Sequence, residues 1–107
     1  MTRMAGGFRI LIMKRAAADL QAVFDRVRSD SPQNAPRVVK RMLDAIDGLK
    51  AFPHRTIARG YSAKAKEPVR SLPVQSWVVF FRVRDSEKVV RILRVRHGSQ
   101  RRPRKLE

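Results

Sequence analysis

The sequence predicts an α+β domain in which a helical hairpin packs on one face of an antiparallel sheet. The chain starts with a short apolar run and continues with two segments in which apolar residues recur every three or four positions. It then ends with three segments that have the composition of β-strands. This order of elements is typical of α+β domains. The length of 107 residues fits one domain, so we assign residues 1–107 to it, with residues 1–7 and 98–107 as flexible ends.

The first strand is expected at residues 8–13, where bulky apolar residues run up to the basic pair Lys14 and Arg15. A helix follows, because the spacing of the apolar residues changes to that of an amphipathic helix. Ser29 to Pro32 ends this helix with turn-forming residues. The apolar stripe of the helix consists of Ala17, Leu20, Val23, Phe24 and Val27.

The second helix can start in two ways. Ser31 could cap it with Pro32 at the first helical position, but Pro36 would then clash with the Pro32 carbonyl. Asn34 as the N-cap places Pro36 in the first turn, where the missing N–H has no cost, so we favour Asn34. Phe52 and Pro53 close the helix. Its apolar positions are Ala35, Val38, Val39, Met42, Leu43, Ile46 and Leu49.

A loop at residues 54–67 precedes strands at 69–74, 76–84 and 88–97, and a three-residue polar connection makes the last two a β-hairpin. Strict alternation divides each strand of the hairpin between two faces. One face should be apolar and meet the helices, while the other is exposed, apolar at one end and rich in arginine at the other. In the middle strand Trp77, Val79, Phe81 and Val83 face one way, and Val78, Phe80, Arg82 and Arg84 face the other. In the last strand Val89, Arg91, Leu93 and Val95 share one face, and Val90, Ile92, Arg94 and Arg96 share the other.

The charge is extreme: 25 Lys and Arg against 9 Asp and Glu give a formal net charge of +16. Such a surplus points to a partner of opposite charge, such as nucleic acid, an anionic membrane or an acidic protein. Fifteen of the basic residues follow Phe52, with only four acidic ones, so the excess belongs to the loop, the sheet and the tail. Arg82, Arg94 and Arg96 form a candidate anion-facing patch, unless they merely make an exposed face soluble.

Several classes of protein are excluded. The sequence has no cysteine, so it has no disulfide framework, thiolate zinc site or cysteine nucleophile, in keeping with the cytoplasm. No apolar run is long enough for a signal peptide or a membrane span. His54 and His97 lie far apart with no acidic cluster near either, so we expect neither a metal nor a cofactor.

The sequence resembles the RelE/ParE superfamily of toxins from type II toxin–antitoxin modules, and within it the ParE branch. The resemblance covers nearly the whole chain in the right order. In the helical hairpin it rests on residues 14–20, Ser31-Pro32 and residues 49–53. In the sheet it rests on residues 69–74, residues 77–82 and the run Ile92-Leu-Arg-Val-Arg-His97-Gly98-Ser99. Gln100 and Arg101 depart from the Arg and Asp that commonly stand there in ParE-like sequences.

The resemblance implies a growth-inhibiting toxin, of the kind that also stabilises plasmids, held in a hetero-oligomer with a small acidic ParD-like antitoxin. ParE-like members poison DNA gyrase and are not established hydrolases, whereas RelE-like members cleave mRNA in the ribosome without a metal. Cleavage of RNA needs a proton acceptor, a proton donor and a cation for the phosphorane. No aromatic residue follows His97, and the chain's one tyrosine is Tyr61 in the loop, so a plausible proton-transfer pair is missing and the gyrase interpretation is favoured. A generic basic nucleic-acid-binding domain is a third interpretation, which explains the exposed apolar positions less well.

The candidate site residues form overlapping sets. His97 could instead cap the strand end, Arg70 and Arg82 could pair with nearby carboxylates, and Trp77 is core or antitoxin contact rather than a platform for a base. The residues expected to bind the target are Arg70, Arg82, Arg94, Arg96, His97 and Arg101. If the protein is a nuclease, the catalytic candidates are Arg70, Arg82, Arg94 and His97. The residues expected to bind the antitoxin are Trp77, Val78, Phe80, Leu20 and Phe24.

Overall fold

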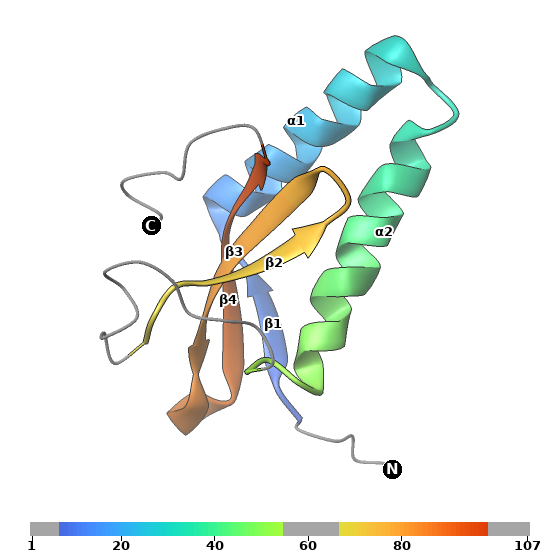
Figure 1. Ribbon diagram of the computed structural model, residues 1–107. Helices are drawn as coiled ribbons and strands as arrows, with labels where there is room; N and C mark the ends of the chain where they lie inside the picture. The colour runs from blue at the N-terminus through green and yellow to red at the C-terminus, as the bar shows by residue number, and fades with distance from the viewer. Residues whose placement is uncertain (1–6, 55–66, 99–107) are drawn as a thin grey trace.

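The computed structural model describes residues 7–54 and 67–98, which form the α+β fold predicted from the sequence (Figure 1). Most of the predicted loop and nearly all of the predicted flexible ends, including Arg101, lie outside the described residues. The elements in chain order are β1 (Arg9–Ile12), α1 (Lys14–Asp30), α2 (Ala35–Asp47), the 3-10 turn η1 (Gly48–Lys50), β2 (Arg70–Val74), β3 (Trp77–Arg84), the 3-10 turn η3 (Asp85–Glu87) and β4 (Val89–His97).

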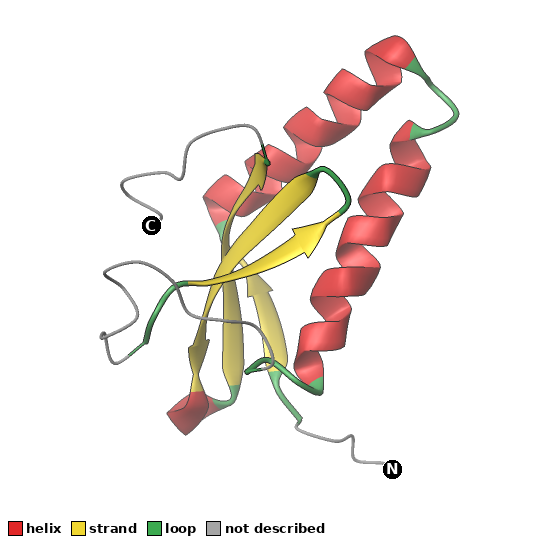
Figure 2. Ribbon diagram, viewed as in Figure 1, coloured by secondary structure: helices red, strands yellow, loops and turns green. Residues whose placement is uncertain are grey.

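Within the described residues the strands form one four-stranded sheet in the order β1-β4-β3-β2 (Figure 2). The expected antiparallel pairing is confirmed for β2, β3 and β4. The N-terminal strand joins this sheet as well: β1 runs parallel to β4, with Arg9 opposite Val89 and Ile12 opposite Ile92. The sheet is therefore mixed, and the helical hairpin carries the chain from β1 to β2 at the opposite edge of the sheet.

The helices α1 and α2 lie side by side and contribute one wall of the principal core (Figure 1). The helix α2 begins after Asn34 as predicted, with Pro36 in its first turn. Asn34 does not cap through its side chain, whose amide instead donates to the Ser31 hydroxyl at 2.9 Å. On α1 the buried stripe is shifted by one position at its start, because Ala16 is buried and Ala17 is exposed.

A β-bulge in β4 makes the predicted division of that strand between two faces wrong. Phe81 pairs with Ile92 but Phe80 pairs with Arg94, so Leu93 is an extra residue in the ladder. A bulge shifts the alternation by one position. Val95 therefore lies in the principal core with Ile92. Each residue after the bulge lies on the face opposite to the one that strict alternation from Ile92 would give it. Strict alternation could not reveal this, since each half of β4 alternates correctly by itself.

The face of the sheet opposite the helices carries a small second core. Phe80 and Leu93 are buried there with Val69, and Val78 and Met13 pack against them. The expectation of an exposed apolar end on this face is therefore wrong for Phe80, whose exposed fraction is 7 %. Arg82 and Arg84 lie on the same face of β3 as Phe80. The arginine-rich end predicted for this face is therefore present.

Candidate functional site

The register of the sheet divides the predicted target-binding arginines between its two faces. Arg96 is opposite Val78, which packs on the second core, so Arg96 and Arg82 belong to the face away from the helices. Arg70 is opposite Phe81, a residue of the principal core, so it belongs to the helix-bearing face at an edge of the sheet. Residues paired across an antiparallel ladder share a face. The structure therefore places Arg70 on the opposite face of the sheet from Arg82 and Arg96.

Arg94 is bound to a carboxylate of α1. Its Nε and a terminal guanidinium nitrogen donate to Asp19 at 2.8 and 3.2 Å, and the Val95 N–H donates to the same carboxylate at 2.8 Å. Both charged side chains are mostly buried, at 17 % and 18 % exposed. These hydrogen bonds from the guanidinium to Asp19 raise the pKa of Arg94 above its ordinary value. Arg94 thus connects the sheet to α1, and its charge is already neutralised.

His97 lies at the end of β4 directly opposite Trp77, and the two rings are perpendicular with their centroids 5.0 Å apart. A small pocket of about 160 Å³ opens between these rings and α1. The Nε of Arg96 is buried and has no hydrogen-bond partner among the described residues. The lining residues are Asp19, Ala22, Val23, Arg26, Trp77, Val95, Arg96 and His97.

This pocket brings Arg96 and His97 together as predicted, and it adds Asp19 and Arg26, which the sequence analysis missed. Asp19 stands directly before Leu20 of the buried stripe. A carboxylate next to a buried position is the one feature of the sequence that could have indicated a contact with the sheet. Arg26 offered no such indication, because α1 carries several exposed basic residues. With Arg26, Arg96 and His97 on its walls, the pocket is suited to an anionic group.

Glu67 ties the beginning of β2 to the arginine-rich face of the sheet. Its carboxylate accepts from Arg84 Nε at 2.9 Å and from Arg91 at 3.0 Å. The hydrogen bond from Arg84 is the main reason why the pKa of Glu67 lies below its ordinary value. Glu67, which with Asp85 and Glu87 is one of the carboxylates that Arg70 or Arg82 could pair with, is thus bound by Arg84 and Arg91.

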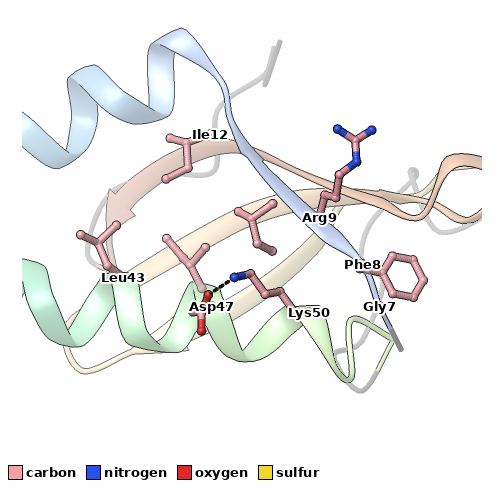
Figure 3. Close-up of a pocket in the computed structure, with 9 residues that line it drawn as sticks. Gly7, Phe8, Arg9, Ile12, Leu43, Asp47 and Lys50 are labelled. Atoms are coloured by element: carbon pink, nitrogen blue, oxygen red, sulfur yellow. Dashed lines mark ion pairs between the residues drawn. The ribbon is translucent and has the colours of Figure 1, made fainter. Parts of the chain in front are cut away.

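A second concave surface, the β1–α2 groove, has a volume of about 660 Å³. Ile12 and Leu43 stand on its facing sides, and Asp47 pairs with Lys50 beside it (Figure 3). Ile12 and Leu43 are 38 % and 41 % exposed, large values for such side chains. The groove is lined by Gly7, Phe8, Arg9, Ile10, Ile12, Leu43, Ile46, Asp47 and Lys50.

The side chains expected to bind the antitoxin do not form this groove. Leu20 is 8 % exposed and Phe80 is 7 % exposed, and both belong to the cores of the domain. Trp77, Val78 and Phe24 are half-buried, so they retain surface for a partner. The exposed apolar surface that the sequence analysis missed comes from β1 and α2, because a strand of four residues gives no alternation that distinguishes an open edge from a covered one.

Among the described residues no group of three His, Cys, Asp or Glu side chains could hold a metal ion. Within the same part of the chain no helix is long and apolar enough to cross a membrane. The chemistry available at the end of β4 is that of a cationic and aromatic pocket next to a neutralised ion pair.

A helical hairpin crossing from β1 to a β2-β3-β4 meander is the RelE/ParE-like fold. The family described as "ParE toxin of type II toxin-antitoxin system, parDE" matches residues 10–102. The chain belongs to this ParE toxin family of the RelE/ParE type II toxin–antitoxin superfamily. A curated relative, Toxin RelE2 of Caulobacter vibrioides, is 35 % identical over 86 residues, which are 80 % of this chain and 90 % of the relative.

Solved structures show the same fold. The chromosomal ParDE toxin–antitoxin system from P. aeruginosa contains a chain that superposes with a TM-score of 0.70 at 23 % identity, covering 87 % of this chain and 98 % of that one. A chain of the toxin–antitoxin complex RelBE2 from Mycobacterium tuberculosis gives 0.66 at 18 % identity, covering 85 % and 98 %. A chain of the archaeal RelE–RelB complex from Pyrococcus horikoshii OT3 gives 0.65 at 16 % identity, covering 89 % and 99 %.

Proposed function

We propose that this protein inhibits DNA gyrase inside the cell and that a small acidic antitoxin neutralises it in a hetero-oligomer. Family membership supports the toxin class. The observation that favours a gyrase inhibitor over a nuclease is the state of Asp19, the one acidic side chain among the described residues that line the pocket with His97. This carboxylate accepts hydrogen bonds from the Arg94 guanidinium and the Val95 N–H.

Three donors already hold this carboxylate on β4, so it serves the packing of α1 on the sheet and is not presented to a substrate hydroxyl. Arginine side chains stay protonated and do not shuttle protons. Arg96 and Arg26 can therefore bind an anion, but they do not complete an acid–base pair with His97. In this proposal the pocket and the arginine-rich face bind the target, through Arg82, Arg96 and His97.

The β1–α2 groove is the proposed seat of the antitoxin. It combines exposed apolar side chains with the basic Arg9, on a chain of net charge +16. An acidic amphipathic segment matches both properties. The structural relatives from P. aeruginosa, M. tuberculosis and P. horikoshii come from toxin–antitoxin systems or complexes, which supports a partner of this class.

The alternative function is that of a metal-independent, ribosome-dependent mRNA endoribonuclease of RelE type. One geometric observation favours it: His97, Arg96 and Arg26 converge on a pocket that could hold a phosphate of RNA. The curated relative named Toxin RelE2 agrees with this candidate.

Induction of the protein without its antitoxin separates the two candidates. Loss of negative supercoiling, DNA breaks and an SOS response, with intact mRNA, are expected for the gyrase inhibitor. Codon-periodic mRNA cuts that disappear in His97→Ala or Arg82→Ala would overturn it in favour of the nuclease. Purified gyrase gives the direct measurement, as inhibition of supercoiling by the wild-type toxin and its reversal by the antitoxin.

A further inference from the structure

The outer edge of β4 is covered by two different elements. Its first half pairs with β1, which ends at Ile12 opposite Ile92. Its second half, after the bulge, extends beyond β1, and α1 lies next to it. The Val95 N–H, which a longer β1 would have bound, donates to the Asp19 carboxylate at 2.8 Å. A side chain of a helix thus takes the place of a strand at this edge.

The bulge decides which side chains reach the pocket and the arginine-rich face. Without it, alternation from Ile92 would put Arg94 and Arg96 on the face that carries the principal core. With it, Val95 fills the core and the arginines lie outside. The extra residue, Leu93, is anchored in the second core, where it is 1 % exposed.

All hydrogen bonds of Asp19 to the sheet reach the two residues that follow the bulge. Its carboxylate binds the side chain of Arg94 and the main chain of Val95. On the other side β4 pairs with β3 along this segment, with Val95 opposite Val79, and beyond it the Gly98 N–H donates to the Ser76 carbonyl at 2.7 Å. The strand is therefore held from both sides just where His97 faces Trp77.

We propose that Asp19 is a positioning residue for the target-binding end of the toxin. It fixes the register of β4 after the bulge and so holds Arg96 and His97 in place, without contacting the target itself. That the end of β4 binds the target rests on the proposed function, whereas the effect of Asp19 on the register does not. The role of Asp19 in the register can be measured on the toxin alone.

The test compares Asp19→Ala with Asp25→Ala in the full-length protein. Asp25 is a matched control, because it lies on the same helix and its carboxylate accepts from Gln21, at an exposed position. Hydrogen exchange of the Val95 amide should accelerate about tenfold in Asp19→Ala, as expected for one lost hydrogen bond, while Val90 and Phe81 change little. The ring protons of His97 should shift, because the ring currents of Trp77 depend on the distance between the rings.

Inhibition of supercoiling should fall together with these changes in Asp19→Ala and stay at the wild-type level in Asp25→Ala. Asp19→Asn keeps one oxygen that can accept from Val95, so it should restore protection of that amide in part. It also serves as the test variant if Asp19→Ala does not fold. If amide exchange accelerates equally at Val90, Phe81 and Val95, Asp19 stabilises the whole fold and has no specific role in the register. If exchange at Val95 is unchanged, its proposed role in the register is wrong. If the wild-type protein does not inhibit gyrase, the proposed function fails, whereas the exchange and ring-proton measurements still decide the role of Asp19.

Discussion

Trp77 and His97 face each other at the open end of the β3–β4 hairpin, with perpendicular rings and centroids 5.0 Å apart. The tryptophan also packs against the principal core, so the pair connects the core to the pocket beside α1. Edge-to-face aromatic pairs contribute roughly 0.5–1.5 kcal/mol beyond the area that they bury. The pair therefore contributes stability in addition to any contact with a target.

The first prediction follows from this pair. His97→Ala should change the emission of Trp77, the chain's single tryptophan, and lower the free energy of unfolding by about 1 kcal/mol. Fluorescence-monitored urea unfolding measures both effects. His54→Ala is the matched control, because His54 pairs with Asp85 and lies by the Phe8 ring instead. Unchanged emission in His97→Ala would show that the two rings are not in contact in solution.

The second prediction concerns how the free energy of unfolding depends on pH through Glu67. Because the pKa of Glu67 is lowered in the folded protein, its bonds to Arg84 and Arg91 stabilise the fold fully above the ordinary pKa of a glutamate. This contribution is lost as the pH falls through the lowered pKa, when the carboxyl takes up a proton. Glu67→Gln should cost about 1 kcal/mol at pH 7 and nothing at the acid end, so the two unfolding curves converge. Denaturant unfolding at several pH values tests this, and a constant difference between the proteins would contradict it.

The third prediction concerns the ion pair between α1 and β4. Arg94→Gln leaves the mostly buried Asp19 carboxylate without its guanidinium and should cost about 2 kcal/mol. A raised pKa means that the contribution of Arg94 is complete at every pH below the ordinary pKa of arginine. The loss should therefore be the same at pH 6 and pH 9. Arg37→Gln, at an exposed position on α2, should change the free energy of unfolding by less than about 0.5 kcal/mol. A loss at Arg94 no greater than at Arg37 would mean that the pair does not persist in solution.

The fourth prediction tests the seat of the antitoxin. Leu43→Glu puts a carboxylate into the β1–α2 groove and should weaken antitoxin binding about 100-fold, with toxicity retained. Titration calorimetry and rescue of growth by the co-expressed antitoxin measure the change. Lys40→Glu is the control, since it changes the charge of the same helix by two units, one more than Leu43→Glu, outside the residues that line the groove. Equal losses in the two variants would show that charge, rather than the apolar groove, governs binding.

The elements of the fold could be predicted because each has a local cause. Periodicity located both helices of the hairpin, and the chemistry of Pro36 selected Asn34 as the residue before α2. The composition of the last three strands and the polar residues 85–87 predicted the antiparallel part of the sheet. The place of β1 in the sheet depends on a partner about 80 residues later, which no local pattern reveals.

The candidate site could be predicted only in part, because the bulge at Leu93 and the contact of Asp19 with β4 are tertiary features. Strict alternation puts Val90 and Ile92 on the same face as Arg94 and Arg96, whereas the bulge leaves these two apolar residues in the principal core and the two arginines on the opposite face. The pairing of Arg94 with Asp19 spans 75 positions of the sequence. Arg96 and His97 stand out in the sequence by their charge and their position at a strand end, whereas their neighbours on α1 are brought there by the fold.

Within the described part of the chain β1 is an edge strand, and its outer side faces the groove that Leu43 borders. A main-chain edge offers the same row of donors and acceptors to any extended segment, whatever its sequence. Such an edge by itself cannot distinguish one antitoxin from another. In the proposed complex, discrimination between cognate and foreign antitoxins then falls to the side chains of α2 along the groove. New partner choice can therefore evolve by substitutions on one helix face, while the sheet and its target-binding end stay unchanged.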